Sequence, residues 1–242
     1  MTARADGRQA RWDKHNESRR QRIIDAAVEV IEESEPGSDI QVQQIAAKAG
    51  LSRTVIYRHF DDRADLDRAV QQRILDDLWS DLLPAVTLNG TVPEIIRRII
   101  GTYVRWAVAH PALHLAADHD SDGAGGPLER RMEQLADEIA GLLGLGVAVL
   151  GAEPSEEEAA SVDPLVFGLI GAVFGAVRRW LTRTERQLSA ESLEQLISDS
   201  VWYLIAGHAR SWGITIDPDA PVQDLLGAGG DLAAVAAPTA VR

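Results

Sequence analysis

Helical spacing of the apolar residues, interrupted at intervals by proline, limits most strongly what this chain can fold into. Between residues 17 and 34, Ile23, Ala27 and Val30 recur three or four positions apart, and charged residues occupy most other positions. Most of the prolines lie at or near the end of such a stretch, where a helix tolerates them. Strand-like alternation is confined to the short segment 213–217. The sequence therefore predicts an all-α protein.

The same spacing places the individual helices. They are predicted at about 17–34, 42–49, 53–60, 63–82, 93–109, 111–118, 128–149, 155–184 and 189–211. The Gly- and Asp-rich residues 120–126 predict a loop. Residues 217–242, rich in Ala, Gly and Pro, predict a poorly ordered end of the chain.

Composition narrows the chemistry and the location of the protein. The 242 residues include no cysteine, which excludes disulfides, thiolate metal sites and cysteine nucleophiles. No uninterrupted apolar stretch has the length of a bilayer span, and the arginine-bearing N-terminus has no apolar region typical of a secretory signal. We therefore expect a cytoplasmic protein without a membrane partner.

The charge is distributed unevenly along the chain. The net charge is −13, yet residues 1–22 carry a net +4 and the remainder carries −17. This asymmetry is typical of a short cationic arm on an acidic body. The alternative interpretation is a disordered, solvated tail.

The segment "GLSRTVIYRHF", residues 50–60, carries the main functional signal. Gly50 separates the short helix 42–49 from a second short helix for which Ser52 is a suitable N-cap. Two short helices joined by a glycine turn form a helix-turn-helix. The second helix of such a motif enters a major groove about 12 Å wide and reaches base edges with its first residues. The alternative is a helical hairpin with no role in DNA binding.

Within residues 23–66, the motifs "IIDAAVEVI", "VQQIAAKAGLSRTVIYRHF" and "DDRADL" resemble the DNA-binding region of the TetR family of transcriptional regulators. The resemblance implies an N-terminal three-helix helix-turn-helix domain followed by a larger helical effector-binding and dimerisation domain. Thr54 and Val55 depart from the Gly and Thr that are frequent in the family, and Gln41 and Gln43 also depart from it. The operator sequence therefore cannot be carried over.

The resemblance also implies a division of the chain and a set of DNA-binding residues. The expected parts are a flexible basic arm at 1–16, the helix-turn-helix domain at 17–63, the ligand-binding and dimerisation domain at 64–215, and a flexible tail at 216–242. The residues expected to contact DNA are Gln41, Gln43, Ser52, Arg53, Thr54, Tyr57, Arg58, His59 and Arg63.

A strip of small residues predicts the surface that joins two copies of the chain. A single helix-turn-helix reads few base pairs, and such modules normally act as dimers. In the segment 163–181, residues three or four apart allow two helices to approach closely, namely Gly168, Gly171, Ala172, Gly175 and Arg179. The resemblance places the interface of a homodimer here and on 189–211, as a four-helix bundle. Ordinary packing within one chain is the alternative.

Apolar and aromatic residues in the centre of the chain are candidates for an effector pocket. They are Leu75, Trp79, Ile99, Tyr103, Trp106, Phe167 and Phe174. Their helical stripes carry no charge, which favours a bulky, hydrophobic effector. The alternative is that these residues belong to the ordinary hydrophobic core.

The segment "HPALHLAADHD", residues 110–120, raises one enzymatic alternative. His110 and His114 are four residues apart, a spacing that lets two side chains share a metal on one helical face, although Pro111 separates them. A metal-dependent helical enzyme is therefore one alternative, and a helical adaptor that does not bind DNA is another.

Together these observations predict a ligand-responsive DNA-binding transcriptional regulator rather than an enzyme. We expect a homodimeric repressor that a bulky hydrophobic effector releases from a palindromic double-stranded DNA operator. No cofactor is implied.

Overall fold

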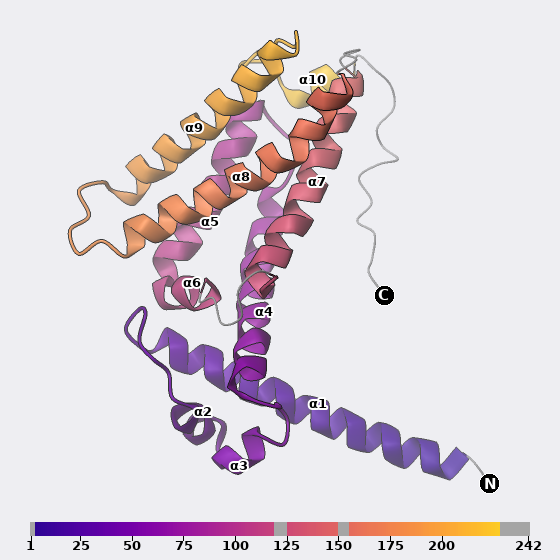
Figure 1. Cartoon of the computed structure of the whole chain (residues 1–242), viewed down its shortest axis with the longest axis vertical. Coiled ribbons are helices and arrows are strands. Elements are labelled where there is room, and N and C mark those ends of the chain that lie inside the picture. Colours follow the sequence, from indigo (N-terminus) through magenta and orange to yellow (C-terminus); the bar gives the residue numbers. More distant parts are fainter. Residues whose placement is uncertain (1–2, 119–124, 150–154, 228–242) are drawn as a thin grey trace. The chain divides into compact units, whose positions relative to one another are not determined.

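In the computed structural model, residues 3–118, 125–149 and 155–227 are described. The regular secondary structure of these residues is helical throughout (Figure 1). The α-helices are α1 (Ala3–Glu32), α2 (Val42–Ala49), α3 (Arg53–Ile56), α4 (Arg63–Leu82), α5 (Val92–Ala109), α6 (Pro111–Ala117), α7 (Pro127–Val149), α8 (Glu156–Leu181), α9 (Ala190–Ser211) and α10 (Val222–Gly227). A 3-10 turn, Leu83–Ala85, follows α4. The predicted all-α class is confirmed.

The chain divides into two compact units. The first contains Met1–Trp79 and Ala109–Arg131, and the second contains Ser80–Val108 and Met132–Arg242. The helix-turn-helix, most of α4, and α6 therefore share one unit. The predicted boundary after residue 63 does not coincide with this division. α4 stays mostly in the first unit, and α6 joins that unit because it packs on α1.

A small apolar core fixes the first four helices of the first unit. Ile23 of α1, Ile45 of α2, Ile56 of α3 and Leu66 of α4 are each at most 2% exposed. Burying an aliphatic side chain of this size contributes about 1.5–3 kcal/mol. Because each helix supplies at least one such residue, the orientation of short α3 is set by the helices behind it.

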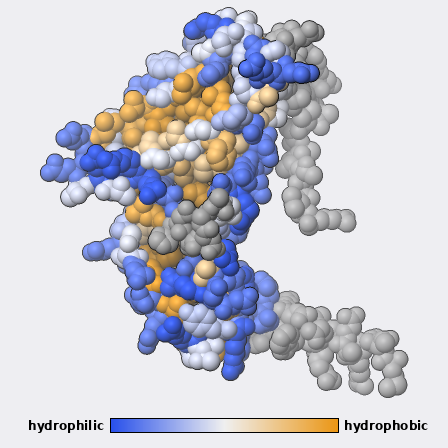
Figure 2. All heavy atoms as spheres, in the orientation of Figure 1, coloured by the Kyte–Doolittle hydropathy of each residue, from blue (hydrophilic) through white to orange (hydrophobic). Residues whose placement is uncertain are grey.

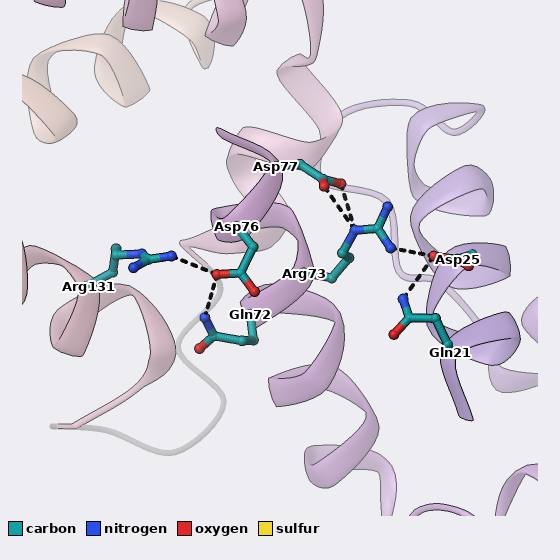
Figure 3. A network of polar contacts seen from close by, with 7 residues as sticks. All are labelled: Gln21, Asp25, Gln72, Arg73, Asp76, Asp77 and Arg131. Atoms are coloured by element: carbon teal, nitrogen blue, oxygen red, sulfur yellow. Dashed lines mark hydrogen bonds and ion pairs between the residues drawn. The ribbon is translucent and has the colours of Figure 1, made fainter. Parts of the chain in front are cut away.

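Ion pairs add a polar layer to the first unit (Figure 3). Arg73 of α4 donates from Nη1 to Asp25 Oδ1 of α1 at 2.5 Å and from Nε to Asp77 Oδ1 at 2.9 Å. On the other side of α4, Arg131 Nη2 lies 2.6 Å from Asp76 Oδ1. All of these side chains are partly solvated, so each pair contributes at most about 1 kcal/mol. Their main effect is to set the register of α4 against α1 and the start of α7.

Two helix boundaries differ most from the predictions. α1 begins at Ala3 rather than near residue 17, so residues 3–16, predicted as a flexible arm, are helical. α3 ends at Ile56 rather than Phe60. The amides of Arg58 and His59 donate to carbonyls three residues back, at 3.1 and 2.8 Å, which is the spacing of a tighter turn.

In the second unit, a cap fixes the start of α8, and α8 packs on α5 and α9. Ser155 caps α8, accepting from Glu158 N while Glu158 Oε2 accepts from Ser155 N at 2.7 Å. These hydrogen bonds from Ser155 stabilise the charged Glu158 carboxylate and therefore lower its pKa from the ordinary 4.5. α5 and α8 meet through the rings of Tyr103 and Phe174, whose centroids are 4.8 Å apart. α8 and α9 pack on each other.

The end of the described chain is tied to the loop before α5. Val222 N donates to Gly90 O at 2.9 Å, and α10 follows at once. Residues 222–227 are thus helical where a poorly ordered tail was predicted, and 228–242 lie outside the described residues. Within the predicted loop 120–126, residues 120–124 also lie outside them.

Candidate nucleic-acid interface

A glycine in the left-handed region joins α2 to α3. Gly50 has φ +65°, and its N–H donates to Ala47 O at 3.1 Å while Leu51 N donates to Ala46 O at 2.9 Å. These hydrogen bonds satisfy the last carbonyls of α2 and reverse the chain within two residues. A residue with a side chain is strained at this φ. The turn therefore sets the direction in which α3 leaves α2.

The start of α2 is held by its own glutamines. Gln41 occupies the N-cap position, and its backbone N–H donates to Gln44 Oε1 at 2.7 Å. Gln41 Nε2 donates to Asp39 Oδ2 at 2.6 Å. By residue type Ser38 or Asp39 would suit the cap, and the structure places Gln41 there instead. Gln43, in the first turn of α2, is exposed.

α3 presents a polar surface at its beginning and an apolar surface behind it. Ser52, Arg53 and Thr54 are exposed, whereas Ile56 and Phe60 are 0% and 2% exposed. The Ser52 side chain makes no hydrogen bond to the helix that it precedes. Ile56 and Phe60 hold α3 on the core, and Ser52 stays exposed at its start.

Aromatic and basic side chains continue this surface beyond α3. The Arg53 guanidinium lies 5.6 Å from the centre of the Tyr57 ring, within the range of a cation–π contact. Tyr57 is half-buried and Arg58 is exposed. Arg20 of α1 lies 4.7 Å over the Phe60 ring and is therefore engaged with the core side of the motif.

His59 is half-buried next to α1. Burial, together with the positive charges of Arg19 and Arg20, lowers the pKa of His59 from the ordinary 6.5. Its Nδ1 is buried and accepts no hydrogen bond from the described residues. Compared with a free histidine side chain, the imidazole therefore favours its neutral form.

Arg63 has a different environment from the other predicted DNA-binding residues. Its Nη1 donates to Ile40 O at 2.7 Å, and its Nε lies 2.7 Å from Asp67 Oδ2. These contacts join the start of α4 to the segment before α2. They give Arg63 a structural task within the chain, which its place in the motif did not reveal.

Two arginines of α1 that were not among the predicted site residues lie near the motif. An added Cβ at Gly50 would lie 3.3 Å from Arg22 Nη2, which places this guanidinium against the turn. Arg19 acts on the pKa of His59 and is exposed. The sequence signalled them only through the positive charge of residues 1–22.

The helix-turn-helix geometry agrees with the comparison with protein families. Residues 23–70 match the model of the bacterial regulatory proteins of the tetR family. The helix-turn-helix segment of the chain is that of the TetR family. The chain is accordingly a DNA-binding transcriptional regulator, and the related proteins that were found are regulators rather than enzymes.

Matches over most of the length extend the similarity beyond the motif. An uncharacterized HTH-type transcriptional regulator of Mycobacterium tuberculosis is 27% identical over 217 residues, 88% of either chain. A tetR-family transcriptional regulator from Streptomyces coelicolor has a TM-score of 0.59 at 22% identity, covering 87% of this chain and 89% of that one. RolR in complex with resorcinol has a TM-score of 0.57 at 16% identity, covering 88% and 95%. The structural matches show the shared fold.

The predicted effector residues of this TetR-family chain fall into both compact units. Leu75 and Trp79 belong to the first unit, where the Trp79 ring lies 5.3 Å from the Arg131 guanidinium. In the second unit, Tyr103 and Trp106 are buried, and Ile99, Phe167 and Phe174 are half-buried. The structure brings Tyr103 and Phe174 into direct contact. A hollow of about 350 Å³ at the end of α9, lined by Trp202, Arg210 and Ile214 among others, includes none of the predicted residues.

The predicted dimer strip is exposed for the most part. Gly168, Ala172, Gly175 and Arg179 of α8 are exposed, whereas half-buried Gly171 faces Met132, whose Cε would lie 3.4 Å from an added Cβ. The neighbouring helix α9 exposes large apolar side chains, with Leu196, Tyr203 and Leu204 at 56%, 68% and 47%. Figure 2 shows the apolar region in the part of the molecule that carries α8 and α9.

Among the described helices, α8 is the one whose length and composition are sufficient to cross a membrane, and 11% of its most apolar stretch is buried. Its N-terminal turn is acidic, and Arg178 and Arg179 lie in its last turn. An exposed apolar helix of this kind needs a partner surface.

The histidines of the segment 110–120 have separate environments. His110 Nδ1 lies 2.9 Å from Glu32 Oε1 at the end of α1, and His114 is 2% exposed on α6. Among the described residues, no three His, Asp or Glu side chains gather in a group suited to a metal ion. His119 and Asp120 lie outside the described residues.

Proposed function

We propose that this TetR-family chain is a homodimeric, cytoplasmic repressor that binds a palindromic operator and is released by a bulky hydrophobic effector. The observation that carries the proposal is the surface of α3. It exposes Ser52, Arg53 and Thr54 to an external partner while Ile56 and Phe60 fix the helix from behind. A slender, rigidly held helix with polar side chains at its start is suited to the major groove.

We assign the contacts by the chemistry of each side chain. Exposed Arg53 suits a guanine edge or a phosphate, and the Ser52 hydroxyl suits a phosphate oxygen. Tyr57 and neutral His59 are proposed as further phosphate donors, and exposed Gln43, Thr54 and Arg58 complete the surface. Gln41 and Arg63 are engaged within the chain, so we propose that they position the motif rather than contact bases.

The exposed face of α8 and α9 supports a second copy as the dimer partner. Leu196, Tyr203 and Leu204 recur at helical spacing on α9, beside the small residues Gly168, Ala172 and Gly175 of α8. Small residues on one helix leave room for large ones on a facing helix, as in closely packed bundles. A bilayer suits this face less well, because α9 carries Glu191, Glu194 and Asp199.

The contacting Tyr103 and Phe174 rings, with Ile99, Trp106 and Phe167, support an apolar effector site in the second unit. RolR, which shares the fold, was solved with resorcinol, a small aromatic molecule. For release, the effector must bind the DNA-free conformation more tightly than the DNA-bound one. A coupling of about 1–3 kcal/mol gives roughly a 5- to 150-fold loss of operator affinity.

The proposal is tested by DNA selection followed by effector screening. Full-length protein is incubated with a pool of random-sequence duplexes, and we expect enrichment of a two-fold symmetric sequence. Hydrophobic compounds are then screened by thermal shift, and those that bind are expected to lower affinity for the enriched duplex. Failure to enrich any duplex contradicts DNA binding and favours an adaptor. A compound that binds without lowering affinity contradicts release by that effector.

A further inference from the structure

A segment that turns back at the end of α9 encloses a hollow that the proposed effector site does not use. Gly213, with φ +75°, reverses the chain directly after α9, and the chain then leads to α10 (Figure 1). Ile214 N donates to Ala209 O at 2.9 Å, which satisfies one of the last carbonyls of the helix. Because Ile214 is 7% exposed, its side chain fixes the start of the segment 214–218 on α9.

Small residues of α9 leave the space for this hollow. Ala206 and Gly207 line it on the helix side, and an added Cβ at Gly207 would meet no atom within 4 Å. Ile214, Ile216 and Pro218 line it on the side of the returning segment. Its volume of about 350 Å³ holds roughly a dozen non-hydrogen atoms, at the about 30 Å³ that a water molecule takes in the liquid. We call this space the α9 hollow, and its volume is that of a site for a small organic molecule.

The large polar side chains that line the α9 hollow are hydrogen-bond donors. Arg210 contributes a guanidinium, Tyr203 a hydroxyl and Trp202 an indole N–H. Among the residues that the structure describes, none of these three side chains is engaged in a hydrogen bond or an ion pair. No carboxylate lines the hollow, and Asp217 of the returning segment accepts from Asp219 N at 3.0 Å instead. The hollow therefore offers a positive charge and donors to an external acceptor.

We propose that the α9 hollow binds a small organic carboxylate with an apolar body. The carboxylate accepts from the Arg210 guanidinium, which is suited to two parallel hydrogen bonds, and the body packs against Ile216 and Pro218. An inorganic anion leaves these apolar walls uncovered, and an uncharged apolar molecule leaves the guanidinium without an acceptor. An amphipathic acid satisfies both sides of the hollow.

The α9 hollow is separate from the sites proposed above. It shares no residue with the effector site around Tyr103 and Phe174. On α9, the lining positions 202, 206 and 210 point about 100° away from the mean direction of the exposed apolar residues proposed for the second copy. Tyr203 belongs to both sets. The inference therefore goes beyond the proposed function, and its outcome does not depend on operator binding.

Arg210 also has a structural interpretation. It lies in the last turn of α9, where a positive charge stabilises the helix itself. In that role, replacing Arg210 lowers the stability of the folded chain and leaves the affinity for an acid unchanged. The test therefore measures stability and ligand affinity on the same variants.

The test uses full-length protein with two probes of the same shape, phenylacetate and its uncharged amide, phenylacetamide. Arg210→Gln removes the guanidinium, and Arg183→Gln, which removes an exposed arginine of the same unit outside the hollow, is the matched control. Gly207→Leu fills the hollow without changing the charge, and leucine favours a helix more than glycine does, so the fold is retained. Ligand-observed NMR titration measures affinity, and thermal unfolding followed by circular dichroism measures stability.

Phenylacetate is expected to bind the unmodified protein and the Arg183→Gln control equally, and phenylacetamide to bind about tenfold more weakly or less. Arg210→Gln should weaken phenylacetate binding about 10- to 100-fold with little effect on phenylacetamide, and Gly207→Leu should weaken binding of both. Absence of saturable phenylacetate binding up to about 10 mM overturns the proposal. So does binding that neither Arg210→Gln nor Gly207→Leu changes, because the acid then binds elsewhere. A less stable Arg210→Gln with unchanged phenylacetate affinity would assign this arginine to the end of α9 alone.

Discussion

Two exposed regions of this molecule differ in the chemistry of what they expose. Around α3 the exposed side chains are polar or basic, as in Ser52, Arg53 and Thr54, and the apolar ones are turned inward. On α9 the most exposed large side chains are apolar, with Tyr203 at 68% and Leu204 at 47%. The difference teaches which kind of partner each region suits. A polar surface on a rigid support suits DNA, whereas an extended apolar surface suits another protein surface.

The two regions also differ in how they are built. α3 has four residues and depends on the core behind it, so its position is set by other helices. α8 and α9 have 26 and 22 residues and are capped by Ser155 and Ser189. Changes on the exposed face of α9 should therefore affect association, and changes on the exposed face of α3 should affect DNA affinity. The predictions below test this separation, in order of decreasing effect.

The largest effect is expected from charges on the apolar face of α9. Tyr203→Glu/Leu204→Glu places four carboxylates in the interface of a two-fold dimer, where their desolvation is costly. We expect the dimer dissociation constant to rise by at least about 1,000-fold, or about 4 kcal/mol. Analytical ultracentrifugation measures it, and Glu185→Lys, an exposed change outside this face, is the control. An unmodified protein that is already monomeric would contradict the dimer.

A smaller effect is expected on α3. Arg53→Ala removes the proposed base or phosphate contact and should lower operator affinity about 10- to 100-fold, corresponding to about 1–3 kcal/mol. Tyr57→Phe should lower it less, because only one hydroxyl is removed. Both variants should sediment as the unmodified protein does. If Arg53→Ala unfolds the chain, the side chain belongs to the structural support, and the contrast between the two regions disappears.

The ion pairs of α4 are expected to affect the stability of the first unit. Arg73→Met keeps the aliphatic stem but removes the ion pairs with Asp25 and Asp77, so the first unit should be destabilised by about 1 kcal/mol or less. The destabilisation should shrink in high salt, because exposed charges are screened. Denaturant unfolding with and without about 1 M NaCl measures both effects. A salt-independent destabilisation would assign the effect to packing of the arginine stem.

The smallest effect is expected from His59. Its pKa is lowered in the folded chain by burial and by Arg19 and Arg20, so the unfolded chain binds more protons as the pH falls through 6.5. Folding stability should therefore decrease slightly below pH 6.5, and His59→Gln should reduce this decrease. Thermal unfolding between pH 7.5 and about 5 provides the measurement. An identical pH profile in both proteins would show that folding does not lower the pKa of His59.

Sequence reasoning succeeded where side-chain pattern determines structure. α2 and α4 were predicted with the bounds that the structure has, because apolar residues at helical spacing are followed by Gly50 in one case and Pro84 in the other. The first part of α1 was missed because a helix without an apolar stripe leaves no periodic signal. The end of α3 was missed because Tyr57 to Phe60 keep the helical pattern of apolar residues while the backbone tightens.

The candidate site was predictable in its location and less so in its details. The sequence identified the turn and the exposed residues of α3, since motif and burial agree there. It did not reveal that Arg63 is held by Ile40 O, a carbonyl 23 residues earlier in the chain. Nor did it separate Gly171, which faces Met132, from the exposed glycines of α8. Both distinctions depend on contacts between distant segments, which one sequence without relatives does not encode locally.

One side chain at the base of α5 restricts how the connection before it can vary. The Arg98 guanidinium donates to Ala85 O at 2.9 Å, Thr87 O at 2.5 Å and Asn89 O at 3.0 Å. One planar guanidinium binds the backbone carbonyls of three alternate residues, which fixes the spacing between these carbonyls. The side chains of the three residues take no part and can vary. Insertions or deletions within 85–89 should thus be poorly tolerated, and lysine, with a single nitrogen, should not replace this arginine.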